Sequence, residues 1–114
     1  MKKHYLCLDL KDQPELIEIY RKYHQPGGVW PEVLESIRAS GISQMEIFLA
    51  GNRMFMIMEV DESFDMEAKA KSDASNPKVQ EWEELMWKFQ QALAFADKGV
   101  KWVEMEQIFD LSKH

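Results

Sequence analysis

A chain of 114 residues with 46% hydrophobic and 30% charged residues has the size and composition of one compact domain, which we expect to span residues 1–114. Its net charge of −6, with no run of Lys or Arg longer than two residues, argues against a nucleic-acid partner or an anionic membrane. Cys7 is the single cysteine, so an internal disulfide is excluded, and the sequence has no signal peptide or membrane-spanning apolar run; these features predict a cytoplasmic protein.

Hydrophobic periodicity predicts the elements in chain order. Apolar residues recur at every second position in the strand segments and at three- and four-residue steps in the helix segments. We expect the side chain of Asp12 to cap the first helix, with Pro14 in its first turn. The predicted elements are a strand at 4–10, a helix from Pro14 to just before Pro26, a helix at 31–41, strands at 42–49 and 53–60, a short helix from about Phe64, a helix at 78–93 and a strand at 101–109.

This order, with the short helices joined to their neighbours, is βαββαβ. It predicts the ferredoxin-like α+β fold, in which an antiparallel sheet carries helices on one face. The strand at 53–60 has Met54, Met56 and Met58 on one face and Phe55 and Ile57 on the other, so both faces are apolar. We therefore expect the free face of the sheet to be covered, as a two-fold dimer with its sheets face to face would do.

Tyr20 and His24 are the first candidates for chemistry. They stand four residues apart, which places both side chains on one face of a helix. His is suited to proton transfer near neutral pH, and Tyr can donate or accept through its hydroxyl. The alternative is a structural pair, in which Tyr20 is a core residue and His24 interacts with the helix dipole. The spacing alone does not decide between a catalytic and a structural pair.

Two tryptophans are the next candidates. The indoles of Trp30 and Trp82 could pack on the apolar face of a sugar ring or of another flat ligand. Trp82 lies on the inward stripe of its helix, so a role in the core is the alternative. The three histidines and Cys7 lack metal-ligand spacing, and no nucleotide-binding glycine motif is present, so we expect no metal and no cofactor.

Together these residues form a pattern that resembles the L-rhamnose mutarotase family, over roughly residues 4–111. The pattern is Y-x-x-x-H-x-P at 20–26, W-P-E at 30–32, a helix that ends at Gly41, a hairpin, and Q-x-W at 80–82. The resemblance implies a ferredoxin-like domain that dimerises through its sheet as a dimeric α+β barrel. It also implies interconversion of the α and β anomers of a 6-deoxy-hexose, without a metal or organic cofactor.

The same resemblance implies that Tyr20 binds the sugar, that His24 is the acid/base residue and that Trp82 packs on the sugar. We also expect Trp30, Met45 and Glu83 at the substrate site. Met45 stands where the family has a tyrosine and Glu83 where it has a second tryptophan, so neither role carries over as a matched residue.

Two departures from the family pattern bear on the choice of sugar. The loop at 27–29 is longer than in the rhamnose enzymes. A carboxylate at Glu83 in place of an indole favours a hydroxyl held by hydrogen bonds over an apolar ring face, which makes L-fucose rather than L-rhamnose our hypothesis for the substrate. A solvated Glu83 is the alternative.

Two other functions fit the same pattern. One is a small monooxygenase of the dimeric α+β-barrel type, cofactor-free or haem-linked, with His24 as its ligand or base. The other is a non-catalytic module that senses a small ligand, with Tyr20, Trp30 and Trp82 as a binding cage. Because one fold hosts unrelated functions, the fold alone does not choose among the three.

Overall fold

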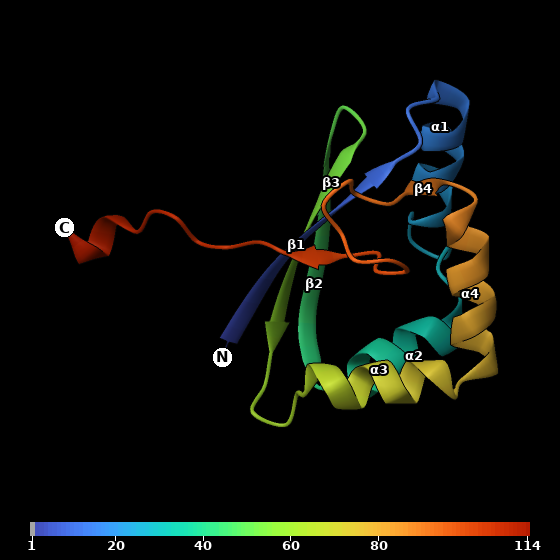
Figure 1. Cartoon of the computed structure of the whole chain (residues 1–114). Coiled ribbons are helices and arrows are strands. Elements are labelled where there is room, and N and C mark those ends of the chain that lie inside the picture. The colour runs from blue at the N-terminus through green and yellow to red at the C-terminus, as the bar shows by residue number, and fades with distance from the viewer. Residues whose placement is uncertain (1) are drawn as a thin grey trace.

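The computed structural model describes residues 2–114, which form one antiparallel sheet with four α-helices packed on one of its faces (Figure 1). The strand order is β2-β3-β1-β4, and β5 also pairs with β1. This is the order of the ferredoxin-like fold, so the predicted α+β fold class is confirmed. The elements are β1 (Lys2–Leu10), α1 (Pro14–Tyr23), α2 (Pro31–Ala39), β2 (Ile42–Ala50), β3 (Arg53–Val60), α3 (Met66–Ala74), α4 (Pro77–Trp87), β4 (Gln90–Gln91), β5 (Val103–Glu104) and a 3-10 turn, η1 (Leu111–Lys113).

The central pair of strands builds the core. In the antiparallel register of β1 and β3, Leu6 faces Met56 and Leu8 faces Met54. All four side chains are buried beneath the helices, because alternate residues of a strand point to the same face. The core is therefore rich in methionine, whose unbranched side chain adapts to irregular gaps.

Proline and glycine bound the helices much as the sequence predicts. Proline stands in the first turn of α1, α2 and α4, and Gly41, with φ +96°, ends α2. The predicted capping role of Asp12 is wrong: Gln13 is the N-cap of α1, and its side chain makes no capping bond. The reason is position, since Pro14 occupies the first helical site and leaves Gln13, not Asp12, directly before it.

The C-terminal third departs most from the prediction. The helix predicted over 78–93 ends at Trp87, because the carbonyl of Phe89 accepts from the Lys11 N–H at 2.8 Å and Gln90 pairs with Leu10 in the sheet. Phe89 is buried as its spacing predicts, but it lies in the turn after α4, where its N–H donates to the Met86 carbonyl at 2.9 Å. Pairing with β1 here outweighs helix propensity.

The strand predicted over 101–109 is also too long. Only Val103–Glu104 pairs with β1, and the Met105 N–H donates once more to the Tyr5 carbonyl at 2.7 Å. The remaining chain extends away from the sheet as a tail (Figure 1). In this tail the side chain of Ile108 is 91% exposed, although it is apolar.

The outer face of the sheet, opposite the helices, also carries apolar side chains. Phe48 pairs with Phe55 and Tyr5 pairs with Ile57 across this face. Phe48 is 52% exposed. The helices thus cover one face of the sheet and leave an aromatic patch on the other, as the sequence pattern of β3 predicts.

Candidate active site

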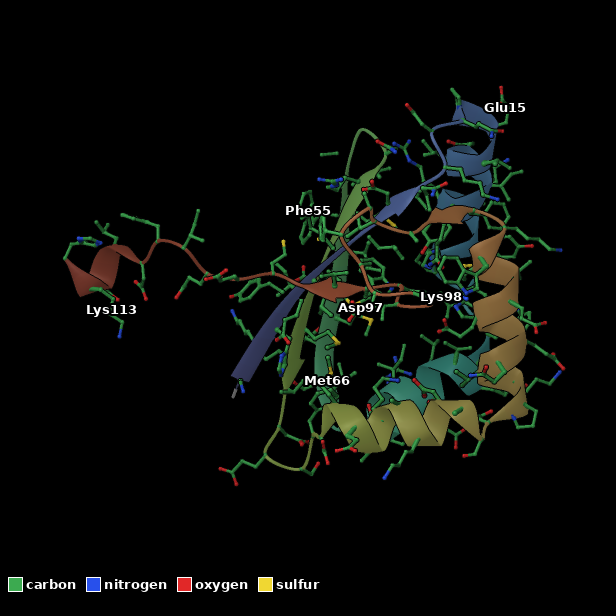
Figure 2. All side chains as sticks on the ribbon, viewed as in Figure 1. Glu15, Phe55, Met66, Asp97, Lys98 and Lys113 are labelled. Carbon is green, nitrogen blue, oxygen red and sulfur yellow. The ribbon has the colours of Figure 1, made fainter. Side chains whose placement is uncertain are left out.

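A cavity of about 570 Å³ lies between the sheet and the helix layer. Side chains of all four helices and of β1, β2 and β3 line it, together with Gln90 and Trp102. Met66, in the first turn of α3, belongs to the lining and is labelled in Figure 2. Of the six residues that the sequence places at the site, five line this cavity: Tyr20, His24, Met45, Trp82 and Glu83.

His24 follows the last turn of α1, and two contacts hold its ring. Its Nδ1 donates to the backbone oxygen of Tyr20 at 2.8 Å, and its imidazole stacks on the Tyr20 ring with 4.3 Å between centroids. No hydrogen bond within residues 2–114 uses Nε2. Burial lowers the pKa of His24, and the bond to the Tyr20 carbonyl partly opposes this. The ring is therefore neutral at physiological pH, with the Nε2 lone pair available as a base.

Tyr20 is buried on the same helix. Its Oη accepts a hydrogen bond from Gln90 Nε2 at 3.2 Å. Burial raises the pKa of Tyr20 to about 12, which the Gln90 bond opposes and the negative charge of Glu83 reinforces. Tyr20 therefore remains a neutral phenol at physiological pH and can donate a hydrogen bond.

Trp82, on α4, is the centre of an aromatic cluster at the cavity wall. Its ring meets those of Tyr23, His24 and Trp30 edge to face, with centroids 5.9, 5.8 and 5.3 Å apart. Trp30 is not among the residues that line the cavity; it packs against Trp82 and fixes the orientation of that indole. The structure thus places Trp30 behind the site residue rather than in the cavity.

Glu83 is anchored at the cavity edge. Its Oε2 lies 2.6 Å from Lys101 Nζ, and the same ammonium donates to the Glu83 backbone oxygen at 2.8 Å. Lys101 Nζ also lies 4.7 Å from the centre of the Trp87 ring. These contacts hold the carboxylate in one position, which a freely solvated glutamate would not keep.

Met45 lies on β2, across the cavity from the helices. It pairs with Met58 of β3, and both side chains line the cavity together with Met56. This wall is apolar, so it suits a methyl group or a hydrocarbon edge of a ligand better than a hydroxyl.

The glycine loop presses on the end of α1 next to His24. Gly27 has φ +86°, a conformation that favours glycine. A Cβ added to Gly28 would lie 2.5 Å from the backbone oxygen of Tyr23. The two glycines therefore let the loop fold tightly against the turn that carries His24.

Sequence reasoning missed Gln90, Lys101 and Trp102. Gln90 falls inside the segment predicted as helix, and Lys101 and Trp102 lie at the start of a predicted strand whose outward and inward faces were not assigned to a site. No local signal marks them as site residues: Gln90 and Lys101 bond to partners far away in the chain, and Trp102 reaches the cavity only because the chain packs on the core there. Within residues 2–114, no group of three or more His, Cys, Asp or Glu side chains could hold a metal ion, and none of the helices is long and apolar enough to cross a membrane.

The sequence model of the L-rhamnose mutarotase family matches residues 3–111. The chain belongs to this family. An L-fucose mutarotase of Xanthomonas campestris pv. campestris is 48% identical over 110 residues, which are 95% of this chain and 88% of that protein. A UPF0734 protein of Dictyostelium discoideum is 40% identical over 109 residues, or 92% and 86% of the two chains. The predicted resemblance to the L-rhamnose mutarotase family is thereby confirmed.

Two solved structures share the fold of this mutarotase-family chain. An L-rhamnose mutarotase of Formosa agariphila superposes with a TM-score of 0.70 at 20% identity, covering 97% of this chain and 99% of that one. Tetracenomycin F2 cyclase of Streptomyces glaucescens superposes with a TM-score of 0.64 at 15% identity, covering 96% and 98%. At these identities the likeness concerns the fold alone, and the cyclase shows that the fold serves other chemistry. Membership of the mutarotase family therefore favours a mutarotase over the oxygenase and ligand-sensing alternatives.

Proposed function

We propose that this chain is a cofactor-independent isomerase that interconverts the α and β anomers of a 6-deoxy-L-hexose, and that it prefers L-fucose to L-rhamnose. One observation carries the proposal: in a member of the L-rhamnose mutarotase family, a neutral histidine with an unoccupied Nε2 lines the same cavity as a neutral tyrosine and an indole. This set of groups matches what mutarotation requires.

Mutarotation of an aldopyranose is a pair of proton transfers. A base removes the proton of the anomeric hydroxyl, an acid protonates the ring oxygen, and the bond between C1 and that oxygen breaks to give the open-chain aldehyde. Rotation about C1–C2 then presents the other face of the carbonyl. Closure reverses both transfers, so no atom or electron is gained or lost and no covalent bond to the protein is needed.

The site supplies one group for each task. In our proposal, His24 Nε2 accepts the proton of the anomeric hydroxyl and returns it on closure. The Tyr20 phenol delivers its proton to the ring oxygen as the bond from that oxygen to C1 breaks, and takes a proton back from it on closure. Trp82 packs on the apolar face of the sugar ring, and Met45 lies on the apolar wall where the C6 methyl group fits.

Glu83 is our candidate for the choice of sugar. L-Fucose and L-rhamnose differ in the configuration of their hydroxyls at C2 and C4, so a fixed acceptor can distinguish them. Lys101 holds one oxygen of Glu83, while Oε1 has no hydrogen-bond partner in residues 2–114 and can accept from a sugar hydroxyl. The 48% identity to an L-fucose mutarotase supports the same preference.

Saturation-transfer NMR of anomer exchange tests the proposal on both sugars. We expect faster exchange of L-fucose than of L-rhamnose, and Glu83→Gln should weaken the preference for L-fucose. Glu84→Gln is the matched control, because Glu84 is the exposed neighbour that does not line the cavity. Equal exchange of both sugars, or faster exchange of L-rhamnose, would contradict the proposed preference. No acceleration with any 6-deoxy sugar would contradict the activity itself.

We also propose that two copies pack through the outer faces of their sheets, in a cytoplasmic homodimer. The exposed aromatic patch at Phe48 and the exposed Ile108 and Phe109 of the C-terminal tail support this, since both leave large apolar side chains in water in a single copy. Sedimentation equilibrium should give twice the chain mass. Phe48→Asp, which places a charge on the patch at the edge strand β2, should give a monomer; a wild-type monomer would contradict the dimer.

A further inference from the structure

Gln90 is the most unusual polar residue next to the cavity. It is only 5% exposed, yet its side chain is polar and belongs to a two-residue strand. Its Nε2 donates to Tyr20 Oη at 3.2 Å. Its Oε1 is the buried side-chain oxygen for which residues 2–114 supply no hydrogen-bond partner.

This arrangement is unfavourable for stability. A buried acceptor without a partner loses its hydration and gains no bond in return. Methionine is similar in length and would fill the same space without an unsatisfied oxygen. The core alone therefore favours an apolar residue at position 90, and the bond to Tyr20 is what glutamine adds.

The bond determines where the phenol hydrogen can point. A phenol has one hydrogen and can also accept, and Gln90 Nε2 can only donate. Because Nε2 already directs its hydrogen at Oη, the Tyr20 hydrogen must point away from Nε2 and is free to meet a ligand in the cavity that Tyr20 lines. The same bond lowers the pKa of Tyr20 against the effect of burial.

The backbone holds Gln90 in place for this task. Gln90 pairs with Leu10 of β1, and the neighbouring Phe89 accepts from Lys11 and meets the Tyr20 ring edge to face at 6.1 Å. The turn after α4, which ends the helix earlier than its periodicity predicts, is what delivers the amide to Tyr20. The short strand β4 thus links the sheet to the catalytic helix.

We propose that Gln90 is a positioning residue that aims the Tyr20 hydroxyl at the ring oxygen of the sugar. This inference rests on the proposed function, in which Tyr20 donates to that oxygen. Gln90 acts through Tyr20 and does not itself transfer a proton.

A double-mutant cycle tests the inference. Gln90→Met should lower kcat/KM for L-fucose anomer exchange about tenfold, the usual effect of losing one oriented hydrogen bond, while Tm stays equal or rises. In the Tyr20→Phe background, which keeps the ring but lacks Oη, the same Gln90→Met change should alter kcat/KM less than twofold. Gln91→Met is the matched control: this exposed neighbour does not line the cavity, and both Tm and kcat/KM should stay at wild-type values.

Additive effects of the two substitutions, or a Gln90→Met variant with wild-type kcat/KM, would overturn the inference. So would a fall in Tm that accounts for the whole loss of activity, which is what a purely structural residue would show. Gln90→Glu provides a second measurement in case the methionine variant folds poorly. Its carboxylate would attract the phenol hydrogen away from the cavity, so kcat/KM should fall at pH 8 and partly recover as the carboxyl group is protonated; a wild-type rate at pH 8 would overturn the inference.

The experiments distinguish a failure of the proposed mutarotase activity from a failure of the proposed role of Gln90. If the wild-type protein does not accelerate anomer exchange, the proposed function is wrong. If it does, and Tyr20→Phe slows exchange while Gln90→Met does not, only the positioning role of Gln90 is wrong.

Discussion

Replacing His24 by asparagine should separate its catalytic from its structural role. The amide nitrogen of asparagine can take the place of Nδ1 and keep the hydrogen bond to the Tyr20 carbonyl, which is 2.8 Å long in the wild-type protein. Asparagine has nothing in the place of Nε2. The substitution therefore removes the proposed base and keeps the contact that orients it, whereas His24→Ala removes both.

The size of each effect follows from these contacts. A positioned acid/base group contributes about 10² to 10⁴ in rate, so loss of Nε2 should raise the activation free energy by about 3–5 kcal/mol. The asparagine variant also loses two ring contacts, one with Tyr20 and one with Trp82. At about 0.5–1.5 kcal/mol each, this reduces the free energy of unfolding by about 1–3 kcal/mol. The alanine variant should lose a further ~1 kcal/mol with its hydrogen bond.

Two measurements check this. Saturation-transfer NMR on L-fucose gives the exchange rate, and urea denaturation gives the free energy of unfolding. We expect both variants to lose activity to the same extent, and the asparagine variant to be the more stable of the two. An asparagine variant that exchanges anomers within threefold of the wild-type rate would refute the role of His24 in proton transfer.

Two further predictions concern pH and the glycine loop. Because burial lowers the pKa of His24 from its usual 6.5, the fall of kcat/KM in acid should be centred below pH 6.5; a decline centred at or above 6.5 would contradict a buried base. As the pH falls, His24 is protonated in the unfolded chain before it is protonated in the folded protein. The free energy of unfolding of the wild type should therefore decrease as the pH drops below about 6.5, and it should decrease less in His24→Asn; urea titrations at several pH values measure both. Gly28→Ala should reduce Tm more than Gly27→Ala. A Cβ at position 28 would lie 2.5 Å from the Tyr23 backbone oxygen, whereas a Cβ at position 27 would have no atom within 4 Å and would be disfavoured only by the left-handed backbone there. Equal decreases in Tm for the two variants would contradict this.

Local patterns were enough to predict much of this molecule. Alternation over residues 4–10 and prolines at the start of helices depend only on neighbouring residues, and they predict β1 and the starts of α1, α2 and α4. The ferredoxin-like order follows from the elements themselves. The spacing of Tyr20 and His24 also predicts correctly that their side chains lie together, because a helix brings residues i and i+4 onto one face.

The errors occur where distant segments compete with local preference. The segment at 88–93 has helical periodicity, but Gln90 and Gln91 pair with β1 instead, and Phe89 is still buried. The tail after β5 alternates like a strand, yet within one copy it meets no strand to pair with beyond Met105. Periodicity shows which residues are apolar, but it does not show which segment of the chain forms hydrogen bonds with their backbone.

The sequence by itself determined the fold class, the family and the pair at the end of α1, since these depend on residue order and on short spacings. Only the tertiary structure decided what surrounds that pair. It placed Trp30 behind Trp82, tied Glu83 to Lys101, and brought Gln90 to the hydroxyl of Tyr20 from 70 residues away. Such contacts form when the whole sheet and helix layer close on each other, so no local pattern records them.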